Sequence, residues 1–402
     1  MPGRASAARV PRPERARRGA RPSVLGALAL AACVHGAGAP RSSIGADATP
    51  AADAPSAPGA PVARPWPEAD ALFHADPRWL GGDVASSVDL GGGRVLWLFG
   101  DSFVAPGAER SRRAATMVRS TVAIETGTDP SRASMAFRWG TGAAGAPAAF
   151  FASEGGAGTW TWPAHGAMVD GALVVFLMRV AAASGGLGFR ADGWTAVRVD
   201  EPAIDPSRWT PLPLATPARS FGVTFGASLL VRDGYLYAFG AEDETHAVYL
   251  ARWPAGAVAR GDLRAPAWWT PSGWIAQDAL AALPAPLFRS GATELSVQTD
   301  PRGAGWLEVQ TTGFGAATLD VRSAPELTGP WSPLATVDTP PESGRPGVLV
   351  YEGKGHPELQ GAQLVATYAS NAGDFATLVA DASLYYPRFV RVDWAPRDTA
   401  RP

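Results

Sequence analysis

The sequence predicts an all-β protein, a five-bladed β-propeller preceded by a lipoprotein signal peptide and a disordered linker. One observation is the composition, with 46% hydrophobic residues, 46 glycines and 37 prolines, which favours short strands joined by tight turns. A second is a succession of short apolar runs broken by Gly, Asp and Pro, with no convincing amphipathic helix beyond a turn or two near Ile275–Leu283. The third is an irregular repeat with five copies.

The first 32 residues carry seven arginines ahead of an apolar stretch of about ten residues, the pattern of a signal peptide (1–32). Leu30-Ala31-Ala32-Cys33 matches a bacterial lipobox, so we expect acylation of Cys33; the alternative is an ordinary signal peptide with a chance cysteine. Residues 33–65 are rich in Ala, Gly and Pro and are expected to be a disordered tether. The expected location is therefore outside the cytoplasm, anchored to the cell envelope.

Charge and cysteine content exclude several classes. The chain has 35 basic and 37 acidic residues; without residues 1–32, 28 and 36 remain, a net charge near −8 that gives no reason to bind nucleic acid. A single cysteine excludes an intramolecular disulfide and, once acylated, a thiolate zinc site. We expect no cofactor, no metal and a monomer, with contact to a membrane only through the Cys33 lipid; a calcium ion held by channel carboxylates stays open.

The folded domain is expected at residues 66–395, followed by a tail at 396–402. Fifteen tryptophans suit either a core or flat platforms for sugar rings. The strands that we expect are Val95–Phe99, Leu173–Met178, Tyr235–Phe239, Ala247–Arg252, Trp306–Gln310, Ala317–Val321, Leu364–Tyr368 and Phe389–Val392.

The repeat distinguishes a propeller from a sandwich or a barrel. Its copies are anchored at residues 83, 165, 226, 294 and 356, with gaps of 82, 61, 68 and 62 residues, each suited to one four-stranded blade with long outer loops. We expect residues around Phe73 to add an outer strand to the last blade and so close the ring.

In a propeller, the start of each inner strand and the end of its hairpin partner lie on one face, because the two strands are antiparallel. Each repeat therefore contributes two positions to one mouth of the channel. The positions are Asp83, His165 with Trp162, Gly226, Glu294 and His356 at strand starts, and Asp101, Arg179, Glu242 with Asp243, Thr312 and Asn371 at hairpin ends.

Carboxylates gathered in one pit suit glycosidic cleavage, which needs one acid to protonate the leaving oxygen and one carboxylate as nucleophile or base. We predict Asp83 and Asp101 as this pair, with Glu294 assisting. The predicted substrate contacts are Trp162, His165, Arg179, Asp243, His356 and Asn371. Structural alternatives stay open: both aspartates follow glycine and suit turns, the histidines could be buried and hydrogen-bonded, and Arg179 could pair with an acid.

Two segments carry a family resemblance. Trp79-Leu80-Gly81-Gly82-Asp83 with Leu96–Phe103, and the Gly329-Pro330-Trp331-Ser332 stretch, resemble bacterial propellers of domain of unknown function 4185. Val248–Arg252 and His356–Leu359 with Tyr368 add weaker similarity. The resemblance covers residues 66–395. It implies a five-bladed fold like that of arabinanases and fructosidases, and Asp83 and Asp101 as the catalytic pair. It also implies an endo-acting enzyme, because some members cleave internal bonds of the polysaccharide D-arabinan. Gln310-Thr311-Thr312 replaces a tyrosine-bearing run, which affects substrate choice.

The expected function is hydrolysis of a polysaccharide or oligosaccharide, arabinan-like, by an exported lipoprotein. The first alternative is a surface lipoprotein that binds or scaffolds carbohydrate without cutting it. The second is a protein-interaction platform, which would have an apolar mouth poor in carboxylates.

Overall fold

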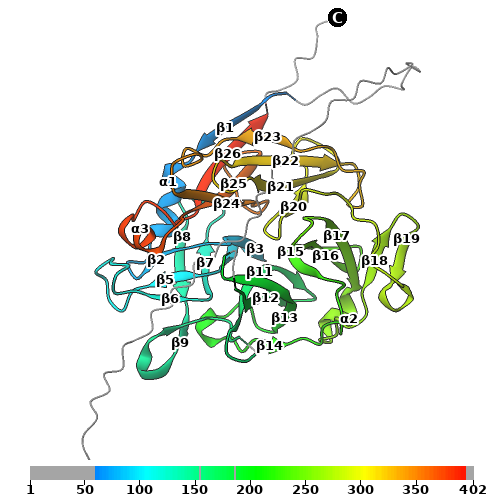
Figure 1. The fold of residues 1–402 in the computed structure, drawn as a ribbon, viewed down its shortest axis with the longest axis horizontal. Coiled ribbons are helices and arrows are strands. Elements are labelled where there is room, and N and C mark those ends of the chain that lie inside the picture. Colours follow the sequence, from blue (N-terminus) through cyan, green and yellow to red (C-terminus); the bar gives the residue numbers. More distant parts are fainter. Residues whose placement is uncertain (1–58, 154, 185–186, 395–402) are drawn as a thin grey trace, which may run out of the picture.

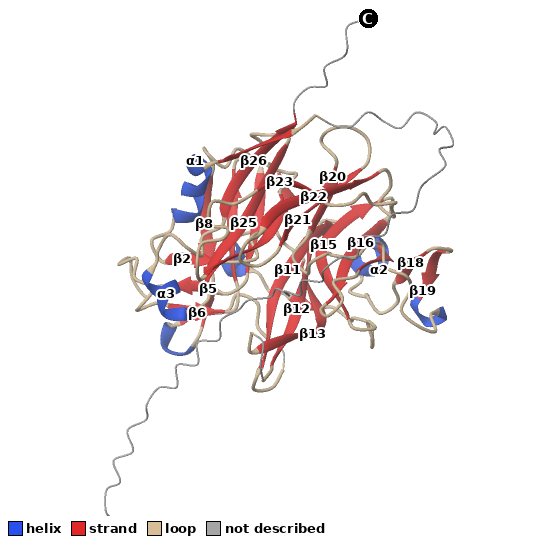
Figure 2. Cartoon of the chain, turned by 45° about the horizontal axis from the view of Figure 1, so that its top comes forward, coloured by secondary structure: helices blue, strands red, loops and turns tan. Residues whose placement is uncertain are grey.

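The computed structural model describes residues 59–394, apart from residues 154, 185 and 186. The predicted signal peptide, Cys33, most of the tether and the tail lie outside this range. Strands dominate the described chain, and the few short helices lie mainly at its edge (Figure 2). The strands expected from the sequence all lie within or largely within observed strands, because short apolar runs bounded by turn residues are a strong signal for β structure.

Five antiparallel sheets form five blades, which confirms the predicted β-propeller. Blade 1 consists of β3 (Ser86–Gly91), β4 (Arg94–Phe99), β7 (Thr121–Thr126) and β8 (Ser134–Arg138). Blade 2 consists of β11 (Thr159–Val169), β12 (Ala172–Ala182), β13 (Phe189–Val199) and β14 (Leu212–Pro213). Blade 3 consists of β15 (Val223–Arg232), β16 (Tyr235–Glu242), β17 (Val248–Pro254), β18 (Ala267–Thr270) and β19 (Gly273–Ala276). Blade 4 consists of β20 (Ser296–Thr299), β21 (Trp306–Thr312), β22 (Thr318–Ala324) and β23 (Ala335–Asp338). Blade 5 consists of β24 (Val348–Gly355), β25 (Leu364–Ala372), β26 (Arg388–Trp394) and β1 (Pro61–Pro65).

The blades are arranged radially, with β3, β11, β15, β20 and β24 gathered around the centre (Figure 1). Each pair of neighbouring blades encloses its own hydrophobic cluster, so that five clusters separate five blades. Burial of apolar area between the sheets is the main term that holds such a ring together.

Side-chain hydrogen bonds also join each inner strand to the next, and we call them the blade-joining bonds. Ser86 Oγ donates to Ala164 O (2.6 Å), Leu229 N donates to His165 Nδ1 (2.9 Å), Val297 N donates to Ser228 Oγ (3.0 Å), Gly355 N donates to Ser296 Oγ (2.7 Å), and Ser87 Oγ shares a hydrogen bond with His356 Nδ1 (2.6 Å). Together they link all five blades around the axis.

The ring is closed by β1, which pairs with β26 from Pro61↔Trp394 to Pro65↔Val390, so that the first and last described strands lie side by side (Figure 1). The folded part therefore begins before Trp66, within the segment expected to be tether. The expectation of a closing strand around Phe73 is wrong. Phe73 lies in the short helix η1 (Ala71–His74), where its buried ring stacks on Phe389 with 5.1 Å between centroids.

Small elements complete the fold. They are β2 (Trp79–Gly82), β5 (Ser102–Val104), β6 (Thr116–Val118), β9 (Gly140–Thr141), β10 (Pro147–Ala148), α1 (Pro67–Asp70), α2 (Ala255–Ala259), α3 (Phe375–Ala380), η2 (Ala143–Gly145), η3 (Pro206–Arg208) and η4 (Gln277–Ala279). The turn of helix expected near Ile275–Leu283 is the end of β19 followed by η4.

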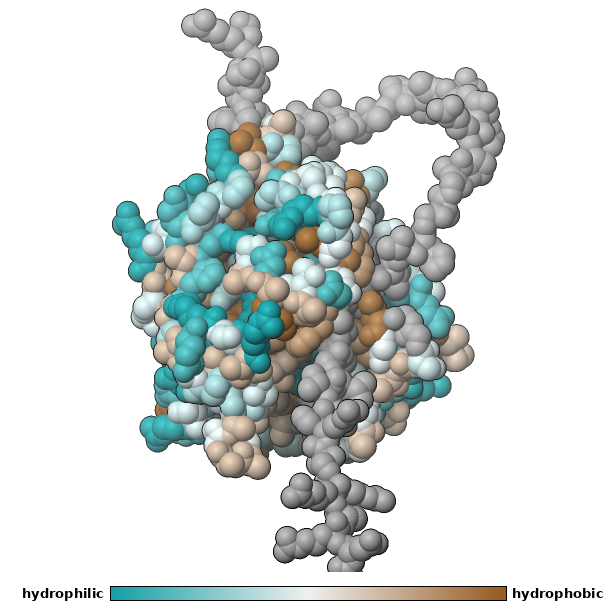
Figure 3. Space-filling model, turned by 60° about the vertical axis from the view of Figure 1, so that its left-hand side comes forward, coloured by the Kyte–Doolittle hydropathy of each residue, from teal (hydrophilic) through white to brown (hydrophobic). Residues whose placement is uncertain are grey.

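Most tryptophans are buried between blades, which favours the core over sugar platforms as the reason for their number. The face in Figure 3 is mostly hydrophilic or neutral, with small separated hydrophobic areas. Among the described residues, Val62, Leu212 and Val231 are the large hydrophobic side chains classed as exposed. No helix in the described part of the chain combines the length and apolar character that a membrane span requires.

Three of the repeat anchors, His165, Gly226 and His356, do not lie at the starts of inner strands. The inner strand of blade 5 is β24, which ends at Gly355, so His356 begins the hairpin loop at the end opposite the mouth. His165 lies within β11, in a break of the pairing register between Pro163 and Gly166, and Gly226 lies within β15, in the break between Phe225 and Ser228. The repeats were aligned by their glycines and histidines. These residues lie at breaks in register or in a hairpin loop, and not at the starts of the inner strands.

Candidate active site

Asp83 and Asp101 are brought together by the small three-stranded sheet of β2, β5 and β6. Asp83 follows β2 and Asp101 precedes β5, and these strands pair through Gly82↔Ser102. In addition, Gly100 N donates to Asp83 O (3.0 Å). The two aspartates therefore lie on adjacent backbone segments, as the sequence predicted.

Gly100 leaves the space that the Asp83 side chain occupies. A Cβ atom at Gly100 would lie only 2.5 Å from Asp83 Oδ1, closer than real Cβ contacts allow. Any larger residue at this position would displace the carboxyl group. The glycine in Phe99-Gly100-Asp101 is thus explained by the close approach of the Asp83 carboxyl group to the backbone of Gly100.

Asp83 is only 4% exposed, and its Oδ2 accepts hydrogen bonds from two tyrosine hydroxyls, Tyr351 (3.1 Å) and Tyr385 (3.0 Å). Burial is the main cause that raises the pKa of Asp83, to about 8, and the nearby charge of Asp101 adds to the rise. The two tyrosine hydrogen bonds oppose it. Asp83 therefore holds a proton near neutral pH that an ordinary aspartate would have lost.

Asp101 is fully buried, and both of its oxygens accept hydrogen bonds. Oδ1 accepts from Trp162 Nε1 (2.8 Å) and Oδ2 accepts from Arg119 Nη1 (2.7 Å), and Arg119 in turn lies over the Trp160 ring at 4.4 Å. Burial raises the pKa of Asp101, while the Arg119 charge opposes the rise. Since both partners can only donate, this arrangement suits the ionised carboxylate.

A third carboxyl, Glu352, comes from an irregular point of β24. Its backbone φ of +57° is in the left-handed region, at a break in the pairing between Tyr351 and Lys354; β15 has Gly226, with φ +125°, at the corresponding break. A non-glycine residue there costs about 1–2 kcal/mol, and such residues cluster at functional sites. Its Oε2 accepts a hydrogen bond from Val84 N. Burial, and then the charges of Asp83 and Glu294, raise the pKa of Glu352 well above its usual value.

Glu294, before β20, is half-buried, and its Oε1 accepts a hydrogen bond from Thr293 Oγ1. Burial raises the pKa of Glu294, while the positive charge of Lys354 lowers it. Lys354 is 3% exposed, and its Nζ donates to Leu295 O (3.4 Å). Burial lowers the pKa of Lys354 to about 8, although Glu294 and Glu352 hold it up.

These groups line a cavity at the mouth, which we call the pit. Its polar lining includes Asp83, Glu294, Glu352 and Lys354, and its apolar lining includes Trp162 and Met178. A larger cavity of about 500 Å³, the cleft, shares Glu294, Tyr351 and Glu352 with the pit and extends over Glu242, Asp243, Arg289 and Thr312. This size suits a sugar or a short oligosaccharide. Asp101 does not line the pit and lies behind Asp83 and Trp162.

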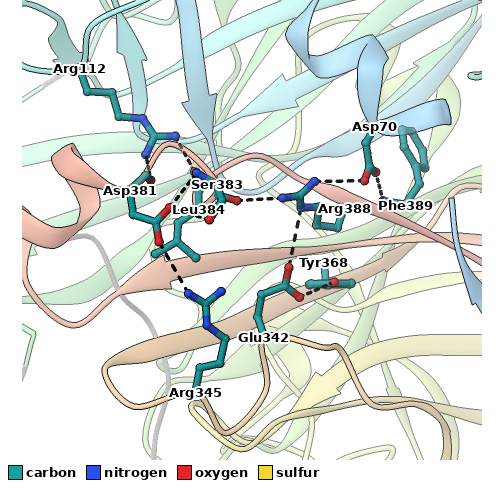
Figure 4. Close-up of polar contacts among 10 residues, drawn as sticks. All are labelled: Asp70, Arg112, Glu342, Arg345, Tyr368, Asp381, Ser383, Leu384, Arg388 and Phe389. Carbon is teal, nitrogen blue, oxygen red and sulfur yellow. Dashed lines mark hydrogen bonds and ion pairs between the residues drawn. The ribbon is translucent and has the colours of Figure 1, made fainter. Parts of the chain in front are cut away.

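Tyr385, which donates to Asp83, belongs to the segment that leads into β26. Figure 4 shows the polar contacts of the residues on either side of Tyr385 in this segment. The buried Arg112 donates to the carbonyls of Leu80 (2.9 Å), Leu378 (2.8 Å), Asp381 (2.9 Å) and Leu384. On the other side, Arg388 donates to Ser383 O (2.9 Å) and forms an ion pair with Asp70 (3.3 Å). Two arginines thus fix the loop that supplies one partner of Asp83.

The other predicted contact residues divide into two groups. Trp162 and Asp243 lie at the pit and the cleft. Asn371 is buried behind Tyr351 and donates to its hydroxyl through Nδ2 (3.0 Å), so it supports a partner of Asp83. Arg179 lines a separate hollow with Asp192, to which it is paired at 2.9 Å.

The two histidines lie in the blade-joining bonds, not on the wall of the pit or cleft. His356 is 1% exposed, and its Nε2 shares a hydrogen bond with Thr367 Oγ1 (2.8 Å). Burial lowers the pKa of both His165 and His356 to about 3, so both are neutral. The structural alternative fits both residues, and the prediction that they contact substrate does not match these positions.

Sequence reasoning missed Arg119, Tyr351, Glu352, Lys354 and Tyr385. One signal was available: Lys354 is the only lysine of the chain, beside 34 arginines. Within residues 59–394, excluding 154, 185 and 186, no group of three or more His, Cys, Asp or Glu residues could hold a metal ion. The mouth is rich in carboxylates, unlike that of the interaction platform considered from the sequence.

Comparison with known proteins gives a family and a fold. A family model described as "Domain of unknown function (DUF5005)" matches residues 68–394. The resemblance to domain of unknown function 4185 is therefore wrong at the level of the family. No curated protein matches the chain.

Among solved structures, a protein from Bacteroides ovatus ATCC 8483, provisionally named a hydrolase, has a TM-score of 0.66 at 17% identity, covering 84% of this chain and 93% of its own. An exo-β-1,3-galactanase from Phanerochaete chrysosporium has a TM-score of 0.44 at 12% identity, covering 79% of this chain and 61% of its own. The catalytic domain of a GH62 α-L-arabinofuranosidase from Coprinopsis cinerea has a TM-score of 0.42 at 11% identity, covering 79% and 92%. The first of these likenesses supports the fold.

Proposed function

The chain belongs to the DUF5005 family, whose description assigns no reaction, and we propose from its site that it is a glycoside hydrolase. Asp83 donates its proton to the glycosidic oxygen as the bond to the anomeric carbon breaks. Glu294 supplies the carboxylate: it either takes a proton from the attacking water or attacks the anomeric carbon itself. Asp83 and Glu294 are therefore the catalytic residues.

The observation that carries this proposal is that two carboxyls in different surroundings line one pit, Asp83 buried beside the carboxylate of Asp101 and Glu294 beside a buried lysine. The pKa of Asp83 is raised to about 8, so it can act as the acid at neutral pH. Glu294 is the more exposed carboxyl; burial raises its pKa too, but the hydrogen bond from Thr293 and the positive charge of Lys354 both favour its ionised form. Neighbouring carboxyls whose environments separate their pKa values are the usual basis of acid and base roles.

Asp101 receives a different role from the one predicted. Its two oxygens are occupied by Arg119 and Trp162, and it does not line the pit. We propose that Asp101 is a positioning residue: its charge raises the pKa of Asp83, and its hydrogen bond fixes Trp162 in the wall of the pit. This arrangement differs from the two-aspartate pair that the resemblance implied.

The charges around the mouth favour an uncharged glycan. Acids outnumber bases along the pit and cleft, where Asp83, Glu294, Glu352, Glu242 and Asp243 face Lys354 and Arg289. Such a surface disfavours uronic acids and sulfated sugars because like charges repel. We therefore propose a neutral polysaccharide, with arabinan the first candidate, and retain export and acylation of Cys33 as part of the proposal.

The test is incubation of the full chain with arabinan, fructan, arabinoxylan and, as an acidic control, polygalacturonate, followed by measurement of new reducing ends. Asp83→Asn and Glu294→Gln are compared with Asp89→Asn, which alters an exposed turn aspartate in the same blade. We expect products from a neutral glycan with the parent and Asp89→Asn only. Retention of a glycan in affinity electrophoresis, with no product over days, would favour the non-catalytic carbohydrate-binding alternative.

A further inference from the structure

Lys354 is unusual in both sequence and position. It is the only lysine among 35 basic residues, and it is 3% exposed on β24, in the wall of the pit. An arginine has a broad planar head that stays charged, whereas lysine carries a compact charge on a flexible stem. In a chain that otherwise uses arginine, a single buried lysine indicates a position where the arginine head is unsuitable.

The acidic groups near Lys354 come from several different elements of the fold. Glu294 approaches from the start of β20, with Asp243 beyond it, and Glu352 lies two residues away on β24, with Asp83 beyond it. His165 and His356, in the blade-joining bonds, are neutral, because burial and then the Lys354 charge lower the pKa of both imidazoles. The positive charge that faces Glu294 therefore comes from Lys354.

Resting on the proposed function, we propose that Lys354 is a positioning residue whose ammonium group keeps Glu294 ionised while Asp83 holds its proton. Without this cation, Glu294 would lie half-buried near Asp243 and Glu352, both of which disfavour its charge. The pKa of Glu294, which burial already raises, would rise further, and the pit would lose the group that favours its carboxylate form. Lys354 acts through Glu294 and needs no contact with the sugar.

The first test compares the pH dependence of kcat/KM for the parent and Lys354→Met. Removing the cation raises the pKa of Glu294, so the midpoint of the acidic limb moves up by about 1 pH unit. The basic limb, which reports Asp83, stays in place because burial and the charge of Asp101 are the main causes that raise the pKa of Asp83. Met178→Leu, an uncharged change in the same wall, leaves both midpoints in place whatever it does to the rate. An acidic midpoint that does not move in Lys354→Met overturns the proposal.

The second test needs no substrate. Full-length chain labelled with ¹³C-lysine gives one lysine side-chain signal, because Lys354 is the only lysine. We expect this signal to titrate with a midpoint near 8 in the parent and lower in Glu294→Gln, since Glu294 holds the pKa of Lys354 up. Asp192→Asn, in the hollow that Asp192 lines with Arg179, leaves the midpoint unchanged.

A midpoint near the ordinary 10.5, or one that Glu294→Gln does not lower, contradicts the pairing of Lys354 with Glu294. This titration also separates the two hypotheses. A chain that cleaves no glycan but shows the expected titration retains the electrostatic coupling of Lys354 to Glu294 and loses the proposed function. An active chain with a normal lysine midpoint retains the function and loses this role for Lys354.

Discussion

The pit and the blade-joining bonds lie close together on the axis of the propeller and use buried polar groups in opposite ways. In the blade-joining bonds, serines, neutral histidines and backbone groups satisfy one another, and each bond connects two blades. In the pit, Asp83, Glu294 and Glu352 surround one lysine, and their pKa values are all raised.

The difference shows what distinguishes a structural polar group from a reactive one in the same channel. A buried neutral group with a partner contributes to stability, whereas buried like charges are unfavourable and readily exchange protons. We therefore expect substitutions in the pit to affect activity first, and substitutions in the blade-joining bonds to affect stability first.

The largest expected effect comes from Asp83→Asn. Loss of the proton donor lowers kcat/KM about 10²- to 10⁴-fold, because the leaving oxygen is no longer protonated. The amide oxygen can still accept from Tyr351 and Tyr385, so we expect the circular dichroism spectrum of the parent. Asp89→Asn keeps the parent rate, and an equally large loss there would point to a general effect of charge.

The same variant gives a stability measurement with a definite sign. The folded pKa of Asp83 is about 8 and its ordinary value is 3.8, so the folded state holds a proton that the unfolded state has lost between these values. The contribution of Asp83 to stability is therefore full below pH 3.8 and is lost as pH rises through 8. Urea titrations from pH 5 to pH 9 should show the parent losing stability relative to Asp83→Asn.

Gly100→Ala comes next. Its Cβ would collide with Asp83 Oδ1, so the carboxyl must move, and displacements of about 1 Å can lower rates about 100-fold. The matched control is Gly256→Ala in α2, where the new Cβ meets only the end of Arg260 at 3.6 Å. Steady-state rates of both variants against arabinan, or whichever glycan is cleaved, test this; a fully active Gly100→Ala would show that the position of Asp83 is not critical.

Asp101→Asn should shift the pH profile more than the maximal rate. The Asp101 charge raises the pKa of Asp83, so its removal lowers that pKa and moves the basic limb of activity to lower pH by about 1 unit. Asp192→Asn also removes the carboxylate partner of an arginine, Arg179, but lies away from Asp83 and should leave the limb in place. Complete loss of activity at every pH in Asp101→Asn would instead support the originally predicted pair of aspartates.

The smallest effect on activity is expected for Ser228→Ala, in the blade-joining bonds. It leaves the buried Val297 N–H without the Ser228 acceptor, which costs about 1–3 kcal/mol of unfolding free energy. Chemical denaturation measures this loss, and the rate at 25 °C should match that of the parent. A variant that is as stable as the parent but slow would reverse the contrast between the two regions.

Much of the fold could be predicted from the sequence, because apolar runs, turn residues and repeat spacing are local signals. They located strands such as β4, β16 and β21 and the total of five blades. The closing strand was not predicted, because Pro61–Pro65 contains two prolines and is stabilised by pairing with β26, more than 320 residues away. The local composition of this segment does not indicate which strand it pairs with.

The site was less predictable, for a related reason. Asp83 and Glu294 lie shortly before β3 and β20, and Trp162 lies within β11, so these three could be found by counting along the repeat. Glu352 reaches the pit from an irregular point within β24, and Tyr385 reaches Asp83 from a loop fixed by Arg112. His356 was expected at the start of an inner strand because the strand before it, β24, is not among the strands expected from the sequence. A break in register within a strand, such as that at Glu352, is not visible as a change in residue pattern.

The central claim, that Asp83 carries a proton at neutral pH, can be measured directly. In full-length chain labelled with ¹³C-aspartate, the carboxyl signal present in the parent and absent from Asp83→Asn belongs to Asp83. We expect this signal to titrate with a midpoint near 8. A midpoint near 3.8, the ordinary value for aspartate, would contradict the account, because Asp83 would then have no proton to donate.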